Sequence, residues 1–210
     1  MPIRLFAMLD NMLRGFKDRL LASSAAFIGT RFHPIQITLL AFFFGLIGIV
    51  ALTQQFYWVG FFMWWVNRFL DGLDGTVARQ HGLQTDLGGY LDILFDFVIY
   101  AAFPIALVIA ELTSAGCLAV IFLLATFYVN AASWMYLSAI LEKRAQGAKA
   151  QGERTTITMP GGLITGAETV LFYCAFILFP AYLVQLYLLM AGLVIVTMIQ
   201  RFVWAVRHLD

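Results

Sequence analysis

The chain has 210 residues, of which 62% are hydrophobic and only 12% are charged. A soluble domain has about 45–50% apolar and about 25% charged residues, because polar groups must cover its surface. The composition therefore excludes a soluble protein and predicts an integral membrane protein. The net charge of +1 carries little information about partners, and we expect no nucleic acid among them.

Residues 1–22 predict an amphipathic helix that lies at the membrane interface. Apolar residues recur there at steps of three and four, and most charged residues fall on other faces of the expected helix. The charges interrupt the segment too often for it to cross a bilayer. It therefore fits a helix in the plane of the membrane surface.

Six apolar blocks follow, and each approaches the ~20 residues needed to cross ~30 Å of hydrocarbon. They predict an all-α integral membrane protein with six transmembrane helices, built as a single domain over residues 1–210. The six-helix bundle would cover about 35–206. The blocks run from about 35 to 52, 56 to 70, 87 to 110, 115 to 141, 161 to 179 and 182 to 203.

The basic residues predict the orientation in the membrane. Of the 13 Lys and Arg residues, five lie in the N-terminal segment, Arg68 and Arg79 flank the connection between the second and third blocks, four lie in the long polar loop after the fourth block, and two lie toward the tail. In a six-span topology these segments share one side, and the opposite loops carry no basic residue. Because cytoplasmic loops are enriched in Lys and Arg, we expect both termini on the cytoplasmic side.

Four aspartates lie where the second block ends and the third begins. Asp71 and Asp74 are three residues apart, and Asp92 and Asp96 are four apart, so each pair shares one face of a helix. Carboxylates near a bilayer cost roughly 2.5–3.5 kcal/mol each and require compensation. Four glycines lie between the pairs, namely Gly75, Gly82, Gly88 and Gly89. They can turn the chain so that the two acidic faces meet at the cytoplasmic end of two antiparallel helices.

Such a cluster would repel itself unless cations were bound in it. Carboxylate oxygens select Mg²⁺, Mn²⁺ or Ca²⁺ rather than Zn²⁺, and we do not expect His81, in the connecting turn, to bind metal. A pair of such ions could clamp a pyrophosphate and stabilise displacement at phosphorus. The spacing alone leaves two other roles open for the four aspartates. They could form an ion or proton pathway in a transporter, or they could be solvated charges at helix ends.

The pattern Asp71-x2-Asp74-Gly75-x2-Ala78-Arg79-x8-Gly88-x3-Asp92-x3-Asp96 resembles the signature of the CDP-alcohol phosphotransferases. All eight signature positions are present, and the expected six-helix topology resembles the family over nearly the whole chain. The resemblance implies a membrane transferase in phospholipid biosynthesis. It would break the pyrophosphate of a CDP-linked alcohol, release CMP, and join the phosphoryl group to a second alcohol.

The resemblance also implies a role for each signature residue. Asp71, Asp74 and Asp92 would bind metal, and Asp96 would bind metal and act as the general base on the attacking hydroxyl. The site would hold Mg²⁺ or Mn²⁺, as two ions. The resemblance further implies that a set of other residues contacts the nucleotide: Gly75, Ala78, Arg79, Thr85, Pro34 and Thr38. Pro34 can also be explained as the ordinary first residue of a helix.

The compact chain resembles the branch of the family that uses CDP-diacylglycerol and a small polar alcohol, in a bacterial inner (cytoplasmic) membrane with the active site on the cytoplasmic side. The other branch uses CDP-choline or CDP-ethanolamine with a lipid acceptor, and it stays open. A transporter and a catalytically silent scaffold are the alternatives of a different class. Membrane lipids are the expected surroundings, and the resemblance implies a homodimer.

The acceptor alcohol stays open between glycerol 3-phosphate, inositol phosphate, serine and others. An acceptor with its own phosphate needs cations, and Lys143 and Arg144 are the candidates, although they also read as topology and headgroup signals. Glu168, an isolated acid in the fifth block, is expected to face a cation or hydroxyl partner such as Arg201 and to line the acceptor cavity. The chain departs from the glycerol-phosphate subgroup, because no Arg follows Thr38 closely.

Overall fold

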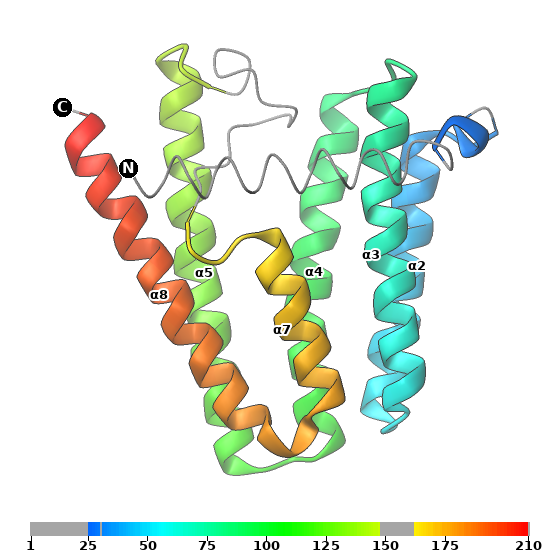
Figure 1. The fold of residues 1–210 in the computed structure, drawn as a ribbon, viewed down its shortest axis with the longest axis vertical. Helices are drawn as coiled ribbons and strands as arrows, with labels where there is room; N and C mark the ends of the chain where they lie inside the picture. Colours follow the sequence, from blue (N-terminus) through cyan, green and yellow to red (C-terminus); the bar gives the residue numbers. More distant parts are fainter. Residues whose placement is uncertain (1–24, 30, 148–161, 210) are drawn as a thin grey trace. The chain divides into compact units, whose positions relative to one another are not determined.

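The structure is a computed structural model that describes residues 25–29, 31–147 and 162–209. The predicted amphipathic helix over 1–22 and most of the polar loop lie outside these residues. All regular elements within them are helices, which confirms the all-α prediction (Figure 1). In chain order they are α2 (Pro34–Thr53), α3 (Tyr57–Gln80), α4 (Asp86–Ala110), α5 (Ser114–Lys143), α7 (Gly166–Leu178), the 3-10 helix η1 (Pro180–Tyr182) and α8 (Leu183–His208).

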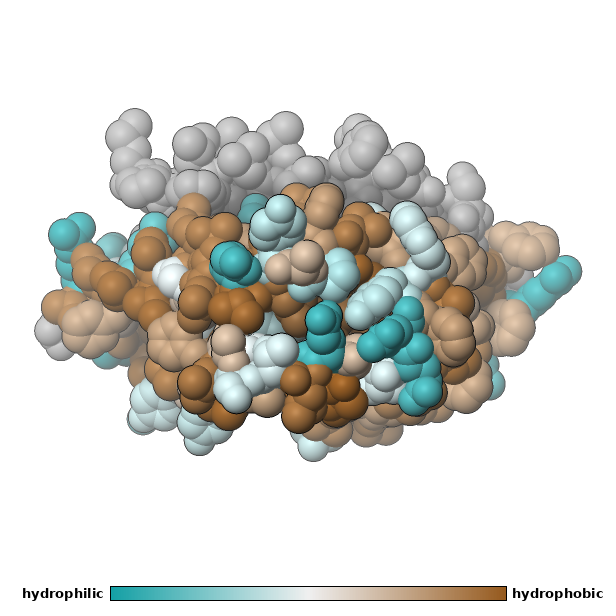
Figure 2. Space-filling view, turned by 90° about the horizontal axis from the view of Figure 1, so that it is seen from below, coloured by the Kyte–Doolittle hydropathy of each residue, from teal (hydrophilic) through white to brown (hydrophobic). Residues whose placement is uncertain are grey.

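Four helical stretches are long and apolar enough to cross a membrane, and they confirm a membrane protein. They are α2, α4, α5 and residues 180–208, which include α8. Large hydrophobic side chains are exposed along the helices, and hydrophobic colouring dominates the face seen in Figure 2. Water-soluble monomers rarely expose apolar patches of this extent. Examples on four different helices are Phe43, Trp58, Ile121 and Phe202.

The fifth predicted span is shorter than expected. Its helix, α7, has 13 residues and begins at Gly166 rather than near residue 161. At 1.5 Å per residue such a helix extends about 20 Å, less than the hydrocarbon core of a bilayer. Thr165 and Glu168 explain the late start, because the Glu168 carboxylate accepts the Thr165 backbone N–H at 3.0 Å, as one half of a capping box does.

The described chain divides into two compact units. One unit contains α2, α3 and α4, within residues 25–113, together with residues 176–180. The other contains residues 114–147, 162–175 and 181–209, and therefore α5, most of α7 and all of α8.

In the first unit, α2 packs against both α3 and α4 through small residues (Figure 1). Its buried stripe includes Ala41, Gly45 and Gly48, at the three- and four-residue steps of one helical face. A Cβ atom on Gly45 would lie 2.4 Å from Cδ1 of Ile99 on α4. Small residues at such positions allow membrane helices to approach closely.

Replacing Gly48 with valine should destabilise this unit. A Cβ atom there would lie 2.9 Å from Cζ of Phe103 and 3.1 Å from Cβ of Met63, and the latter cannot move without its backbone. We expect Gly48→Val to lower the free energy of unfolding by about 1–3 kcal/mol, measured by thermal unfolding in detergent. Gly192→Val on α8 is the matched control, because open space surrounds that position. An equal loss in both variants would contradict the packing argument.

The turn between α3 and α4 brings the two acidic pairs to the same end of the unit. The signature segment up to Gln80 continues α3 as regular helix. Gly82 then adopts φ of +63°, and the N–H of Leu83 donates to the Ala78 carbonyl at 2.9 Å, a Schellman-type ending. Thr85 starts α4, because its Oγ1 accepts the N–H of Gly88 at 3.0 Å. Gly82 is therefore the glycine that turns the chain.

In the second unit, α5 packs against α8 (Figure 1). Polar groups support this contact, since Nη1 of Arg201 donates to Oδ1 of Asn130 at 2.8 Å. The segment before α7 is tied to α8, because the N–H of Ile164 donates to Oγ1 of Thr197 at 2.9 Å. The second bond satisfies a backbone N–H that would be expensive to leave unpaired in an apolar environment.

Candidate functional site

A small cavity in the first unit brings together residues from three helices. It contains three of the four signature aspartates and an arginine outside the signature. Its empty space is about 200 Å³. Much of this space is open to solvent, and the enclosed part is about the size of one water molecule, so a ligand would lie largely outside it. The lining is formed by Thr38, Ala41 and Phe42 of α2, by Asn67, Arg68 and Asp71 of α3, and by Asp92, Phe95, Asp96 and Ile99 of α4.

Arg68 is the centre of the polar contacts in this cavity. Its Nη2 donates to Oδ1 of Asp96 at 2.7 Å, and its Nη1 lies 3.7 Å from Oδ2 of Asp71. The same Nη1 donates to the hydroxyl oxygen of Tyr100 at 2.9 Å, and Nε donates to Oδ1 of Asn67 at 2.8 Å. The residue is only 8% exposed. A single guanidinium therefore links α3 to both ends of one turn of α4.

Aromatic rings hold the same guanidinium from two sides. Its Cζ lies 5.0 Å from the ring centroid of Trp64 and 4.8 Å from that of Tyr100. Cations within about 6 Å of an aromatic face are attracted by the ring, and more strongly when they are shielded from water. The arginine is therefore fixed in position before any ligand binds.

Arg68 bears on the sequence-based predictions only through the orientation of the chain, and its place in the site was not predicted. The available signal was its position, three residues before Asp71 and inside an apolar block. An ionisable residue within a membrane helix is by default a functional candidate. Its contact with Asp96, 28 residues further along the chain, follows only from the packing of α3 against α4.

Asp74 differs from the other three aspartates, because it does not line the cavity. It is 4% exposed, and the Thr38 hydroxyl donates to its Oδ2 at 2.5 Å. The Thr38 hydroxyl also lies 3.1 Å from the Pro34 carbonyl oxygen, as a threonine on a helix often does. Thr38, predicted as a nucleotide contact, thus lies against a signature aspartate.

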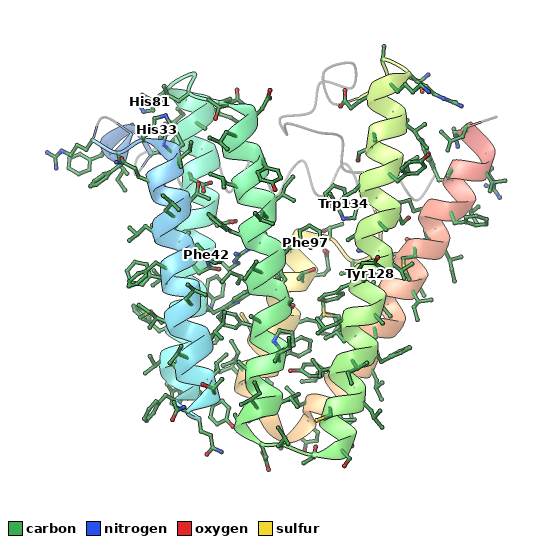
Figure 3. The ribbon with its side chains drawn as sticks, turned by 180° about the vertical axis from the view of Figure 1, so that it is seen from behind. His33, Phe42, His81, Phe97, Tyr128 and Trp134 are labelled. Carbon is green, nitrogen blue, oxygen red and sulfur yellow. The ribbon has the colours of Figure 1, made fainter. Side chains whose placement is uncertain are left out.

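Phe42 and Phe95 form an apolar wall of the cavity. Their rings stack with centroids 4.3 Å apart, and Phe42 lies between α2 and α4 in Figure 3. The sequence has no Arg shortly after Thr38, and the structure shows the uncharged ring of Phe42 at this part of the cavity lining. Within the described residues, Arg68 is the one basic residue in the lining.

The donor groups fit a hard divalent cation. Asp71, Asp92 and Asp96 offer carboxylate oxygens, and the lining contains no Cys or His. In the part of the chain that the structure describes, no three His, Cys, Asp or Glu side chains converge closely enough to hold an ion. In this arrangement Arg68 contacts both Asp96 and Asp71.

The predicted nucleotide contacts of the signature lie at one end of α3. Nη2 of Arg79 is 3.3 Å from Oγ1 of Thr76, and a Cβ atom on Gly75 would lie 3.1 Å from Nη1 of Arg79. The guanidinium therefore folds back over the glycine, which leaves room for it. Ala78 is partly exposed on the same helix.

The remaining predicted contacts of this unit have local roles in helix capping. Pro34 is the first residue of α2, after His33 as N-cap, and Thr85 caps α4. His33 and His81 lie at the same end of α2 and α3 (Figure 3). Pro34 and Thr85 are thus near the signature end of the helices, with their local bonding explained by helix starts.

The predicted acceptor residues lie in the second unit. Lys143 ends α5, and Nη2 of the following Arg144 donates to the Leu209 carbonyl. The Glu168 carboxylate accepts the Thr165 hydroxyl at 2.5 Å as well as its N–H. Thr165 is therefore a hydroxyl partner of Glu168, as expected. Arg201, the partner that the sequence analysis named, donates to Oδ1 of Asn130.

Comparison with known proteins agrees with this arrangement. Residues 31–203 match the CDP-alcohol phosphatidyltransferase family, and the chain belongs to that family. It is an enzyme, a phosphotransferase that uses a CDP-alcohol donor and an alcohol acceptor among membrane lipids. The family is generally dependent on divalent metal ions.

Three relatives illustrate the range of this similarity. The chain is 34% identical over 149 residues to inner membrane protein YnjF of Escherichia coli, with 71% of each chain covered. It is 37% identical over 98 residues to phosphatidylinositol phosphate synthase of Streptomyces avermitilis, covering 44% of this chain and 38% of that one. It is 38% identical over 78 residues to the bifunctional IPC transferase and DIPP synthase of Aquifex aeolicus, covering 37% and 18%.

Proposed function

We propose that the protein transfers a phosphatidyl group from CDP-diacylglycerol to the hydroxyl of a small polar alcohol and releases CMP. The observation that carries this proposal is the cavity in which Asp71, Asp92 and Asp96 meet from two helices beside Arg68. A relative whose name is phosphatidylinositol phosphate synthase supports a phosphatidyl donor and a polyol acceptor. The reaction belongs to phospholipid biosynthesis.

In this proposal Asp71, Asp74, Asp92 and Asp96 hold Mg²⁺ or Mn²⁺, as two ions. When bound, these ions neutralise the pyrophosphate and the charge that develops at phosphorus. Asp96 takes the proton from the acceptor hydroxyl as that oxygen forms its bond to the phosphorus attached to diacylglycerol. The bond from this phosphorus to the bridging oxygen breaks, and CMP leaves with the electron pair.

The nucleotide would lie along the signature end of α2, α3 and α4. Gly75 and Ala78 leave space for the cytidine, and Arg79 contacts its phosphates. The partly exposed guanidinium of Arg79, folded over a glycine, supports this placement. Thr38, Pro34 and Thr85 border the same end.

The acceptor would meet residues of the second unit, and Lys143, Arg144 and Glu168 are the proposed contacts. Lys143 and Arg144 directly follow the apolar part of α5, where a phosphate-bearing alcohol in the aqueous phase can reach them.

We further propose that the chain forms one domain with six spans, in which α3 joins the four apolar helices and the segments on either side of the short α7 complete its crossing. The side with all 13 basic residues then faces the cytoplasm, together with both termini and the active site. An inner bacterial membrane is the proposed location, in line with the name of the Escherichia coli relative. The active form would be a homodimer.

The test is CMP release by the purified protein in detergent, with CDP-diacylglycerol and Mg²⁺ or Mn²⁺. Glycerol 3-phosphate, inositol phosphate, serine, inositol and glycerol would be offered as acceptors, and a reaction without acceptor corrects for hydrolysis. We expect release above this background with one acceptor class. CMP release only from CDP-choline or CDP-ethanolamine with diacylglycerol would favour the other branch. Absence of release and of nucleotide binding would contradict the proposal.

A further inference from the structure

Arg68 brings a fixed positive charge into the proposed metal site. We propose that it is a positioning residue, which orients the Asp96 carboxylate and lowers the affinity of the aspartates for divalent cations. This inference rests on the proposed function and adds a residue outside the eight signature positions. Three carboxylates and this one guanidinium line the same cavity.

The geometry explains the orienting role. The contact of Nη2 engages Oδ1 of Asp96 at 2.7 Å and leaves the other carboxylate oxygen for a substrate hydroxyl or an ion. The fork cannot rotate freely, because Tyr100 and Asn67 accept its other N–H groups at 2.9 and 2.8 Å. Hydrogen bonds between charged groups in a shielded position are roughly twice as strong as neutral ones. The arginine therefore fixes the direction of the free oxygen of Asp96.

A further hydrogen bond connects Asn67, which holds the guanidinium, to α2. The amide nitrogen of Asn67 donates to the Ala41 carbonyl at 2.9 Å. All three helices of the unit thus contribute to the position of one guanidinium. An arrangement of this kind reduces the reorganisation that a catalytic carboxylate would otherwise undergo.

The charge of Arg68 weakens metal binding, whereas its hydrogen bonds favour turnover. A positive charge beside carboxylates repels a divalent cation that binds to the same carboxylates, and the effect is large where water is scarce. Removing the charge should therefore tighten metal binding, whereas removing the fork should slow turnover. A residue that only supports the fold would weaken both properties together.

The experiment compares Arg68→Met with Arg68→Lys in the full-length protein. Mn²⁺ affinity is measured by electron paramagnetic resonance without substrate, and kcat by CMP release. We expect Arg68→Met to bind Mn²⁺ about tenfold more tightly and to lose about 10²-fold in kcat. Arg68→Lys keeps the charge and loses the fork, so its Mn²⁺ affinity should stay close to that of the wild type while kcat falls.

Arg201→Met is the control for Mn²⁺ affinity, because it removes a buried arginine of the other unit. Equal or weaker Mn²⁺ binding by Arg68→Met would overturn the inference. If that variant does not fold, an Arg68→Lys variant with wild-type kcat would overturn it instead. Wild-type protein that binds Mn²⁺ but releases no CMP would contradict the proposed function alone, since tighter binding by Arg68→Met would still be measurable.

Discussion

Asp96→Asn should reduce CMP release about 10²–10⁴-fold, the range that general-base catalysis contributes. The amide has nearly the size of the carboxylate, and its oxygen can still accept from Nη2 of Arg68, which lies 2.7 Å from Oδ1 in the wild type. The position of the side chain is therefore preserved while its ability to take a proton is lost. The measurement is single-turnover CMP release at saturating Mn²⁺ and acceptor.

Asp86→Asn is the matched control for this variant. Asp86 begins α4, on the same helix as Asp96, and it is exposed outside the cavity. Its loss removes only a modest favourable interaction with the helix N-terminus. Turnover of Asp96→Asn equal to that of the Asp86 variant would show that another group accepts the proton.

Chelation of divalent cations should abolish turnover in the wild-type protein. The cavity offers carboxylate oxygens from Asp71, Asp92 and Asp96 and no Cys or His among the residues that line it. Hard cations are preferred by such donors, so we expect Mg²⁺ or Mn²⁺ to restore CMP release after EDTA and Zn²⁺ to restore it poorly. The measurement is a titration of each cation into the chelated and dialysed enzyme.

Thermal unfolding serves as the control for the chelation experiment, because it shows whether the protein stays folded without metal. Thermal unfolding of the chelated enzyme should remain cooperative, because Arg68 already contacts Asp96 and Asp71 without an ion. Full turnover in excess EDTA would contradict the proposed role of the four aspartates. Restoration by Zn²⁺ alone would indicate ligands other than the predicted carboxylates.

Most helix positions could be predicted from the sequence, because apolar runs bounded by polar residues indicate where a chain crosses a membrane. The helices α2, α4 and α5 begin and end within a few residues of the predicted blocks. The α3 helix runs further than its apolar part, up to Gln80, and carries the first acidic pair on its last turns. Length and hydropathy alone could not show where the charged part of this helix ends.

The start of α7 shows how an apolar composition can mislead. Residues 162–164 are apolar or glycine, and the sequence analysis counts them in a span, whereas the helix begins after Thr165. The pattern Thr165-x-x-Glu168 was the available sign of a helix start. Glu168 therefore caps the start of α7, and its place in an acceptor cavity stays a prediction.

The site could be predicted only in part. Spacing placed Asp71 with Asp74 and Asp92 with Asp96, and the structure brings one member of the first pair and both of the second to one cavity. The bond from Thr38 to Asp74 and the bond from Arg68 to Asp96 join residues 36 and 28 positions apart. Such contacts depend on which faces of α2, α3 and α4 meet, and no local pattern specifies that.

The hydrogen bond between Thr38 and Asp74 has a consequence for how activity is inherited within this family. Thr38 is outside the 26-residue signature, yet its hydroxyl is the group that fixes one oxygen of a signature aspartate. A descendant could retain every signature residue, lose this hydroxyl, and still satisfy a motif search. If Asp74 binds metal as proposed, a change at Thr38 would remove the hydroxyl that orients this aspartate while every signature residue stays in place.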